Sequence, residues 1–339
     1  MSSGNLFGDA GELQAPAASP AFDLRPLSTG EVLDRTFHLY RSRFALFAGL
    51  ALLPAAVNVI TSAVRLLYAA HQQTHIHTGV ALYTVQIISG VLAVISSLIA
   101  IVLYGITEAA TTWAVSAVYL GEAASIKAAY GVAFRNWFRY TLVKLRQVWA
   151  FLWLPIVLIG AAVAIPGISR RHGGLGGGLL ALTIVVAVLA ALSFIYGVWA
   201  YIRISLAVPA AVVESLKVRA AVRRSAALLT DRKMRIFMLL LLLGALYFVV
   251  GMIESPLLIL AVRSRGTQAF VTYAINLTVT FVAGTLIGPV GAIALCLFYF
   301  DERVRREGFD IEWMMKKIAP AAGGPDLPPQ MPMNSAEPA

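Results

Sequence analysis

Long apolar runs separated by short polar segments dominate the pattern of this chain. The runs fall near residues 44–68, 80–118, 141–165, 178–208, 235–262 and 270–300. A helix needs about 20 mostly apolar residues to cross about 30 Å of hydrocarbon. We therefore predict an all-α polytopic membrane bundle with six transmembrane helices. The second run would reach about 58 Å as a helix, so it must tilt or project from the bilayer.

A short amphipathic stretch precedes each odd-numbered run. The first begins with Ser28 and Glu31, which have the spacing of a capping box. In the second and third, a basic residue followed by two alanines lies five residues after Glu122 and Glu214. These stretches, near 28–44, 122–139 and 214–229, predict three cytoplasmic interfacial helices and suggest a threefold pseudo-repeat. The alternative is that any basic amphipathic segment at a membrane boundary looks similar.

Lys and Arg residues distinguish the two sides of the predicted bundle. Twenty-one of the 27 lie at the termini or after the second and fourth runs, five lie on the other side, and Arg203 lies within a run. Because basic segments resist translocation, the richer side is expected to be cytoplasmic. We therefore expect a multi-pass protein of the inner (cytoplasmic) membrane with both termini in the cytoplasm.

The regions outside the runs are expected to be short. Residues 1–25 are expected to form a disordered cytoplasmic leader, and 26–300 the six-helix domain with its interfacial helices. A cytoplasmic amphipathic helix is expected at 301–319, followed by a disordered Pro-rich tail at 320–339.

The composition agrees with a membrane protein and reduces the classes of partner to consider. The chain is 59% hydrophobic and 13% charged, whereas soluble domains carry roughly 25% charged residues. The net charge of +10 lies beside apolar runs rather than in a soluble module, which favours anionic lipid headgroups on the cytoplasmic leaflet over nucleic acid. The candidate headgroup contacts are Arg35, Arg41, Lys127, Arg135, Lys217, Arg223, Arg224, Arg303, Arg305 and Arg306.

Three segments together resemble the bacterial glycerophosphoryl diester phosphodiesterase membrane-domain family. They are LRPLSTGEVLDRTFHLYRSRF at 24–44, PAAVVESLKVRAAVRRSAALL at 209–229 and YFDERVRREGFDI at 299–311. The family takes its name from proteins that join such a domain to a soluble phosphodiesterase barrel. A barrel of that kind needs about 250 residues, and the longest soluble piece of this chain is far shorter. The resemblance therefore implies a membrane module rather than a catalytic activity.

Ionisable residues inside the predicted spans are the strongest functional candidates. Glu108, Arg203 and Glu254 are the Asp, Glu, Lys or Arg residues that we place well inside the runs, where charged groups are costly and commonly functional. Glu108 and Arg203 are expected at similar depth, either as an ion pair or each reaching the interface alone.

Glu254 precedes a proline in the outer half of its run. Together with Asn276, Asn58 and Arg65 it is expected to line a small polar pocket, the alternative being that Glu254 only braces neighbouring helices.

Other candidate chemistry has a simpler structural interpretation. His71, His75 and His77 form a His-rich patch in the first outer loop, but closed zinc sites normally require four ligands. The carboxylates after residue 300 alternate with arginines, as helical ion pairs do. We predict no metal and no cofactor.

Three function classes remain, ranked by these observations. The first is a non-enzymatic scaffold or accessory subunit that interacts with lipids or partner proteins. The second is a transporter of small solutes or lipids. The third is a membrane-embedded protein that processes glycerophosphodiesters, which the family name alone suggests.

Overall fold

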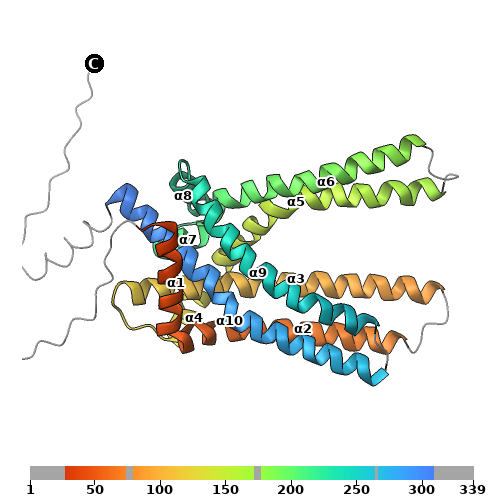
Figure 1. Ribbon diagram of the computed structural model, residues 1–339, viewed down its shortest axis with the longest axis horizontal. Helices are drawn as coiled ribbons and strands as arrows, with labels where there is room; N and C mark the ends of the chain where they lie inside the picture. Colours follow the sequence, from red (N-terminus) through yellow and green to blue (C-terminus); the bar gives the residue numbers. More distant parts are fainter. Residues whose placement is uncertain (1–26, 74–78, 172–176, 264–265, 309–339) are drawn as a thin grey trace, which may run out of the picture.

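Helices account for nearly all of the chain that the computed structural model describes, which is residues 27–73, 79–171, 177–263 and 266–308. These ranges contain no strand, and six of their helices are long and apolar enough to cross a membrane. The prediction of an all-α bundle with six spans is confirmed (Figure 1). In chain order the helices are α1 (Thr29–Ser42), α2 (Phe44–Gln73), α3 (Gly79–Tyr119), α4 (Ile126–Arg135), α5 (Trp137–Arg171), α6 (Gly177–Ile204), α7 (Ala207–Val213), α8 (Val218–Leu228), α9 (Lys233–Arg263) and α10 (Gly266–Glu307).

The observed spans follow the predicted runs closely. The first span covers Phe44–Tyr68, and the second covers Thr84–Tyr119 within the 41-residue helix α3. Helix α10 continues without a break from the sixth span through its charged part to Glu307. Asp301 and Glu302 are buried, so this part belongs to the packed bundle. The predicted helix beyond residue 308 and both predicted disordered ends lie outside the described residues.

The order of short helix, span and span occurs three times, through α1–α2–α3, α4–α5–α6 and α8–α9–α10. In each short helix the N-cap carbonyl accepts a hydrogen bond from the N–H four residues later, at 2.9 to 3.0 Å. The fourth and eighth residues after the N-cap are buried in all three helices: Val32 and Thr36, Ala129 and Ala133, and Ala221 and Ser225.

The joints between short helix and span are also equivalent. The carbonyls of Arg43, Asn136 and Arg232 each accept hydrogen bonds from the N–H groups three and four residues later. The fourth, seventh and eleventh residues after each joint are buried, namely Phe47, Leu50 and Pro54, Tyr140, Val143 and Gln147, and Ile236, Leu239 and Leu243. The three units therefore share one register of buried positions, as expected for the threefold pseudo-repeat.

The six long helices form a ring in the order α2, α3, α5, α6, α9 and α10, in which each contacts the next and α10 also contacts α3. Helices α5 and α6 pack closely on each other, because Gly197 lies against the Phe151 carbonyl where a Cβ would be 2.4 Å away. Figure 1 shows the α5–α6 pair diverging from α2, α3 and α10 with distance from the end that carries α1, α4, α7 and α8.

The fourth apolar run is broken between α6 and α7, which the sequence analysis did not predict. Pro209 has no N–H to donate to the Ser205 carbonyl, so the helix loses a backbone hydrogen bond there. Gln147 of α5 instead donates its Nε2 to the carbonyls of Ile204 at 2.9 Å and Ser205 at 3.3 Å. Ser225 of α8 accepts from the Leu206 N–H at 3.1 Å. Side chains from α5 of the same unit and from α8 of the next unit thus satisfy the broken backbone.

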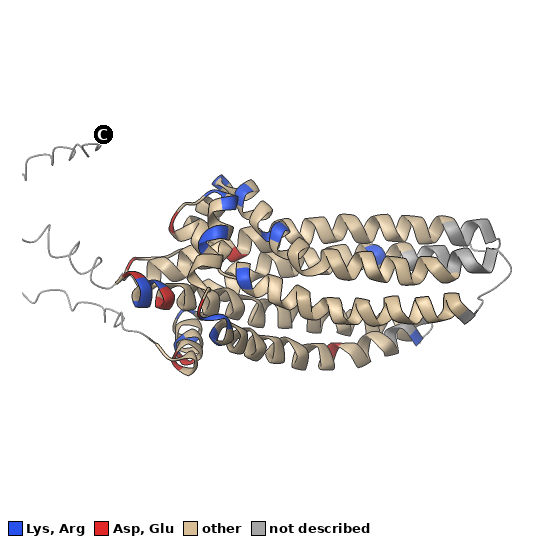
Figure 2. Ribbon diagram, turned by 90° about the horizontal axis from the view of Figure 1, so that it is seen from above, with Lys and Arg blue, Asp and Glu red and all other residues tan. Residues whose placement is uncertain are grey.

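Lys and Arg residues gather at the end of the molecule that carries α1, α4, α7 and α8 (Figure 2). We call this the basic end. At its centre Arg235 of α9 lies 2.5 Å from Asp301 Oδ2 and 2.8 Å from Glu302 Oε1. The backbone of Leu27 completes the cluster, because its N–H donates to Asp301 at 2.5 Å and its carbonyl accepts from Arg235 and from Arg305. Both carboxylate side chains are 0% exposed.

A second ion cluster joins α8 to α10. Arg224 lies 2.9 Å from Glu214 and 2.5 Å from Glu307, and the Tyr299 hydroxyl donates to Glu214. Its hydrogen bond to Glu307 is the largest influence that raises the pKa of the Arg224 guanidinium, so this group stays charged. The two clusters bring together the segments near 24–44, 209–229 and 299–311, which are far apart in the sequence.

Candidate functional site

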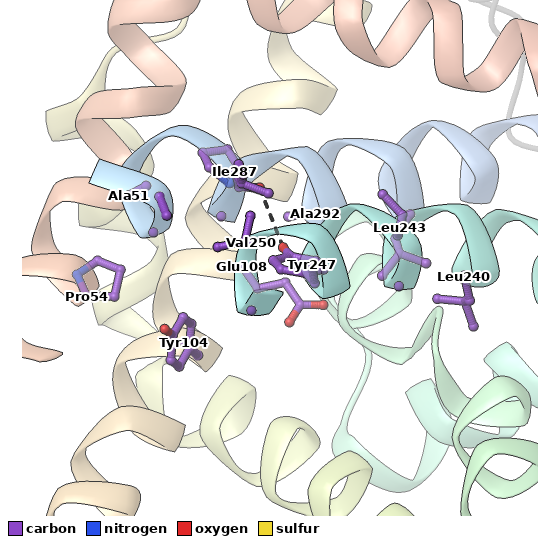
Figure 3. Close-up of a pocket in the computed structure, with 18 of the residues that line it drawn as sticks. Ala51, Pro54, Tyr104, Glu108, Leu240, Leu243, Tyr247, Val250, Ile287 and Ala292 are labelled. Atoms are coloured by element: carbon purple, nitrogen blue, oxygen red, sulfur yellow. Dashed lines mark hydrogen bonds between the residues drawn. The ribbon is translucent and has the colours of Figure 1, made fainter. Parts of the chain in front are cut away.

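A cavity of about 960 Å³ lies between the spans and is lined by residues of α2, α3, α5, α6, α9 and α10 (Figure 3). Its volume is at the upper end of the range of about 300–1,000 Å³ that is common for ligand sites. Most of the lining side chains are apolar. The lining of α10 runs from Thr280 to Leu295, which corresponds to about 22 Å along the helix axis.

The cavity is not sealed along α9. Leu241 and Phe248 line it, and these side chains are 54% and 67% exposed. In a bilayer the open side of the cavity adjoins the hydrocarbon region.

An ion pair lies in the cavity wall between α3 and α5. Lys144 Nζ is 2.5 Å from Glu108 Oε2, and the two side chains are 21% and 11% exposed. Gly105, one turn before Glu108, allows this pairing, because a Cβ there would lie 3.2 Å from the Tyr140 carbonyl and 3.3 Å from the Lys144 Cβ. Figure 3 shows the Glu108 carboxylate projecting into the space between the helices.

The hypothesis that Glu108 pairs with Arg203 is wrong. The cation on Glu108 is Lys144, whereas Arg203 is exposed and its guanidinium lies over the Trp199 ring, 4.9 Å from the centroid. The sequence analysis counted Lys144 with the cytoplasmic cations that precede the third span. Its position eight residues after the joint at Asn136, just beyond the buried Val143, is the signal that places it inside the bundle.

Hydroxyl groups surround the ion pair. Tyr201 and Tyr247 line the same part of the cavity, and the Tyr247 hydroxyl donates to the Ile287 carbonyl at 3.5 Å. Thr111, one turn after Glu108, also lines the cavity. Its buried Oγ1 has no hydrogen-bond partner within the described part of the chain. A buried hydroxyl without a partner is costly, so this wall has unused hydrogen-bonding capacity.

The four residues predicted to share a polar pocket, which are Glu254, Asn276, Asn58 and Arg65, are only partly brought together. Glu254 and Asn58 line the cavity, and Asn276 is buried behind Glu254, where its Nδ2 donates to the Glu254 backbone carbonyl at 3.4 Å. Arg65 is exposed and is not part of the lining. The bracing hydrogen bond therefore uses the backbone of Glu254, while its side chain contributes to the cavity wall.

The predicted headgroup residues fall into two groups. Arg224, Arg303, Arg305 and Arg306 form ion pairs within the protein, with Glu214, Glu307, Asp301, Glu302 and Asp231 as partners. Arg35 lies 3.5 Å from the Tyr119 hydroxyl. Exposed at the basic end are Arg41, Lys127, Arg135, Lys217 and Arg223. A lipid contact stays a prediction for all ten, and the five exposed residues are the ones best placed for it.

The histidine patch cannot be placed, because the side chains of His71, His75 and His77 lie outside the described residues. In the described ranges no group of three or more His, Cys, Asp or Glu side chains is arranged to hold a metal ion.

Comparison with known proteins neither supports nor contradicts the family resemblance of the three segments. No family model matches the chain, no curated protein matches it, and no solved structure matches it.

Proposed function

We propose that this protein binds a lipid or lipid-like amphiphile in the cavity between its six spans. The observation that carries the proposal is a cavity of about 960 Å³ that has a mostly apolar lining, contains the Glu108–Lys144 pair and is accessible along α9. Ligand sites of this type are largely apolar with a few polar groups that fix orientation. The proposal favours lipid binding over assembly of protein partners as the main role of this protein.

The dimensions of the cavity support an elongated ligand. Its length of about 22 Å exceeds the thickness of one hydrocarbon leaflet, which is about 15 Å. A lipid chain fits along the apolar middle, and the hydroxyls and ion pair near Thr111 offer a polar end.

The site is proposed to lie in a bacterial inner (cytoplasmic) membrane, with the basic end and both termini in the cytoplasm. The gathering of Lys and Arg at one end supports this orientation through the positive-inside rule (Figure 2). Topology reporters fused near Asp231 should give a cytoplasmic signal, and fusions near Gly174 an extracytoplasmic one. A cytoplasmic signal at Gly174 would contradict the orientation.

Lipid retention by cavity-filling variants tests the binding proposal. Gly244 and Gly251 line the cavity, and a Cβ at either position would meet no atom within 4 Å. A phenylalanine there should therefore occupy the cavity without displacing a helix. We expect native mass spectrometry of the purified wild-type protein to show a bound amphiphile, and Gly244→Phe and Gly251→Phe to lose at least about nine-tenths of it, a loss of about 1.4 kcal/mol in binding free energy.

Gly90 provides the matched control. It also lies in a span and has no atom within 4 Å of a Cβ, but it is not part of the cavity lining. Gly90→Phe should retain the amphiphile at the wild-type level. Equal retention by all three variants, or no bound amphiphile in the wild-type protein reconstituted in native lipids, would contradict the proposal.

Transport of a lipid is the second candidate, and the distribution of polar groups along the cavity favours it. The Glu108–Lys144 pair lies toward the basic end of the lining, while Glu254 lies further along α9 toward its opposite end. A headgroup can therefore meet polar side chains at two depths. Proteoliposomes that contain fluorescent lipid should show faster exchange between leaflets than protein-free liposomes, and Gly244→Phe should remove the difference.

A further inference from the structure

The charges in the cavity wall do not cancel. Glu108, Lys144 and Glu254 are the Asp, Glu, Lys and Arg residues among the lining residues. Lys144 is 2.5 Å from Glu108, so this pair is internally neutral. Glu254 has no such partner, because no ion pair or hydrogen bond of its carboxylate is found in the described part of the chain. The lining therefore carries one uncompensated negative charge.

The position of Glu254 makes this charge available to a ligand. Its side chain is half-buried and lines the cavity, and Asn276 holds the backbone at this point by donating to the Glu254 carbonyl. Lys144 lies 8 residues after the joint at Asn136, and Glu254 lies 22 residues after the equivalent joint at Arg232. The difference of 14 residues places Glu254 about 21 Å further from the basic end than Lys144. Lys144 is thus too distant to neutralise it.

We propose that the ligand of the cavity carries an ammonium group that pairs with the Glu254 carboxylate, so that the cavity selects cationic or amine-bearing amphiphiles over anionic ones. This inference rests on the proposed function, because it names the ligand class of the same cavity.

One physical effect supports an ammonium group at this position. A carboxylate inside a membrane protein is costly when it has no counter-charge, and a ligand cation supplies one. An anionic headgroup would meet the negative charge of Glu254 without compensation.

The test compares two single-chain amphiphiles of equal chain length, tetradecyltrimethylammonium and myristate. Their apparent Kd values are measured on protein in nanodiscs of neutral lipid, at concentrations that do not dissolve the disc, with empty nanodiscs as background. The wild-type protein should bind the ammonium probe about tenfold more tightly than the carboxylate probe, equivalent to about 1.4 kcal/mol. Glu254→Gln should reduce this preference to about twofold or less.

Glu122→Gln is the control for net charge, since Glu122 is exposed at the basic end and does not line the cavity. It should keep the tenfold preference. Tetramethylammonium, which lacks the chain, is added as a competitor to separate a free amine site from an amphiphile site. Weak or no competition supports an amphiphile, whereas full competition at the same concentration contradicts that part of the proposal.

The outcomes separate the two proposals. If wild-type protein binds both probes equally, or if Glu254→Gln keeps the full preference, the ammonium inference is wrong while the cavity remains a binding site. If neither probe binds above background, or if Gly244→Phe leaves the binding of both unchanged, the proposed function itself is wrong.

Discussion

Two ion clusters in this bundle differ in what surrounds them. At the basic end, Arg235 pairs with Asp301 and Glu302, whose side chains are 0% exposed, and the Leu27 N–H donates to Asp301. In the cavity wall, Lys144 neutralises Glu108, but both side chains retain exposure and adjoin the empty volume. The first cluster is sealed by the chain itself, and the second adjoins space that a ligand can occupy. Full burial therefore distinguishes the ion cluster that holds the fold together from the ion pair that is available for binding.

Removal of Arg235 should have the largest effect on stability. Arg235→Met removes the cation that two buried carboxylates share and leaves Glu302 with only the more distant Arg306, 3.9 Å away, among the described residues. Breaking a buried pair in this way costs about 3–5 kcal/mol. We expect loss of a monodisperse peak in fluorescence-detected size-exclusion chromatography, or a large drop in Tm. Arg219→Met, at an exposed position of the same end, should change the Tm little. A wild-type Tm for Arg235→Met would show that this cluster does not hold the fold.

Gln147 tests whether the break in the fourth span depends on a side chain of the third span. Gln147→Met leaves the carbonyls of Ile204 and Ser205 without their donor, at a cost of about 1–3 kcal/mol. The expected result is a lower Tm and faster amide exchange around α7. Thr183→Val removes a hydroxyl that donates to the Leu179 carbonyl within its own helix, and it should leave both measurements near wild type.

The same kind of charge deletion should cost less in the cavity wall than at the basic end. Lys144→Met leaves Glu108 beside an open volume that admits water or a ligand cation, so we expect about 1–2 kcal/mol of destabilisation. The double variant Glu108→Gln with Lys144→Met should recover part of this loss, as a double-mutant cycle would reveal. A loss as large as that of Arg235→Met would contradict the distinction between the two clusters.

The capping box of α1 should give the smallest effect. Ser28 accepts from the Glu31 N–H at 3.2 Å and Glu31 accepts from the Ser28 N–H at 2.6 Å, both at an exposed position. Ser28→Ala should cost about 1 kcal/mol, seen as a small Tm shift. Ser42→Ala is the control, since the Ser42 hydroxyl donates only to the Leu39 carbonyl at the end of the same helix. An equal shift for both variants would show that the cap has no special role.

Apolar periodicity predicted the spans because a helix in hydrocarbon must be apolar over a fixed length, whatever its neighbours are. The first span, predicted at 44–68, has those bounds. The capping box at Ser28 was also predictable, because it is a local interaction whose partners lie within one turn.

Tertiary partners were harder to predict, because they depend on how helices rotate and how closely they approach. Lys144 reaches Glu108 only because Gly105 lets α3 and α5 approach closely. The side chain that donates to the carbonyls at the break before α7 is Gln147, a residue far from the break in sequence. Pro209 was the local signal for that break, and an apolar scan passes over a proline inside a hydrophobic run.

Photocrosslinking from inside the cavity tests the central claim most directly. Phe237 is half-buried and lines the cavity, whereas Phe270 is 65% exposed and does not. Each is replaced in turn by the photoreactive benzoylphenylalanine, which extends the same ring by a benzoyl group, and lipid adducts are quantified in native membranes with and without Gly244→Phe. We predict an amphiphile adduct at position 237 that Gly244→Phe removes, and adducts at position 270 that it does not change. An adduct at 237 that is absent, or that persists unchanged with Gly244→Phe, would contradict a ligand in this cavity.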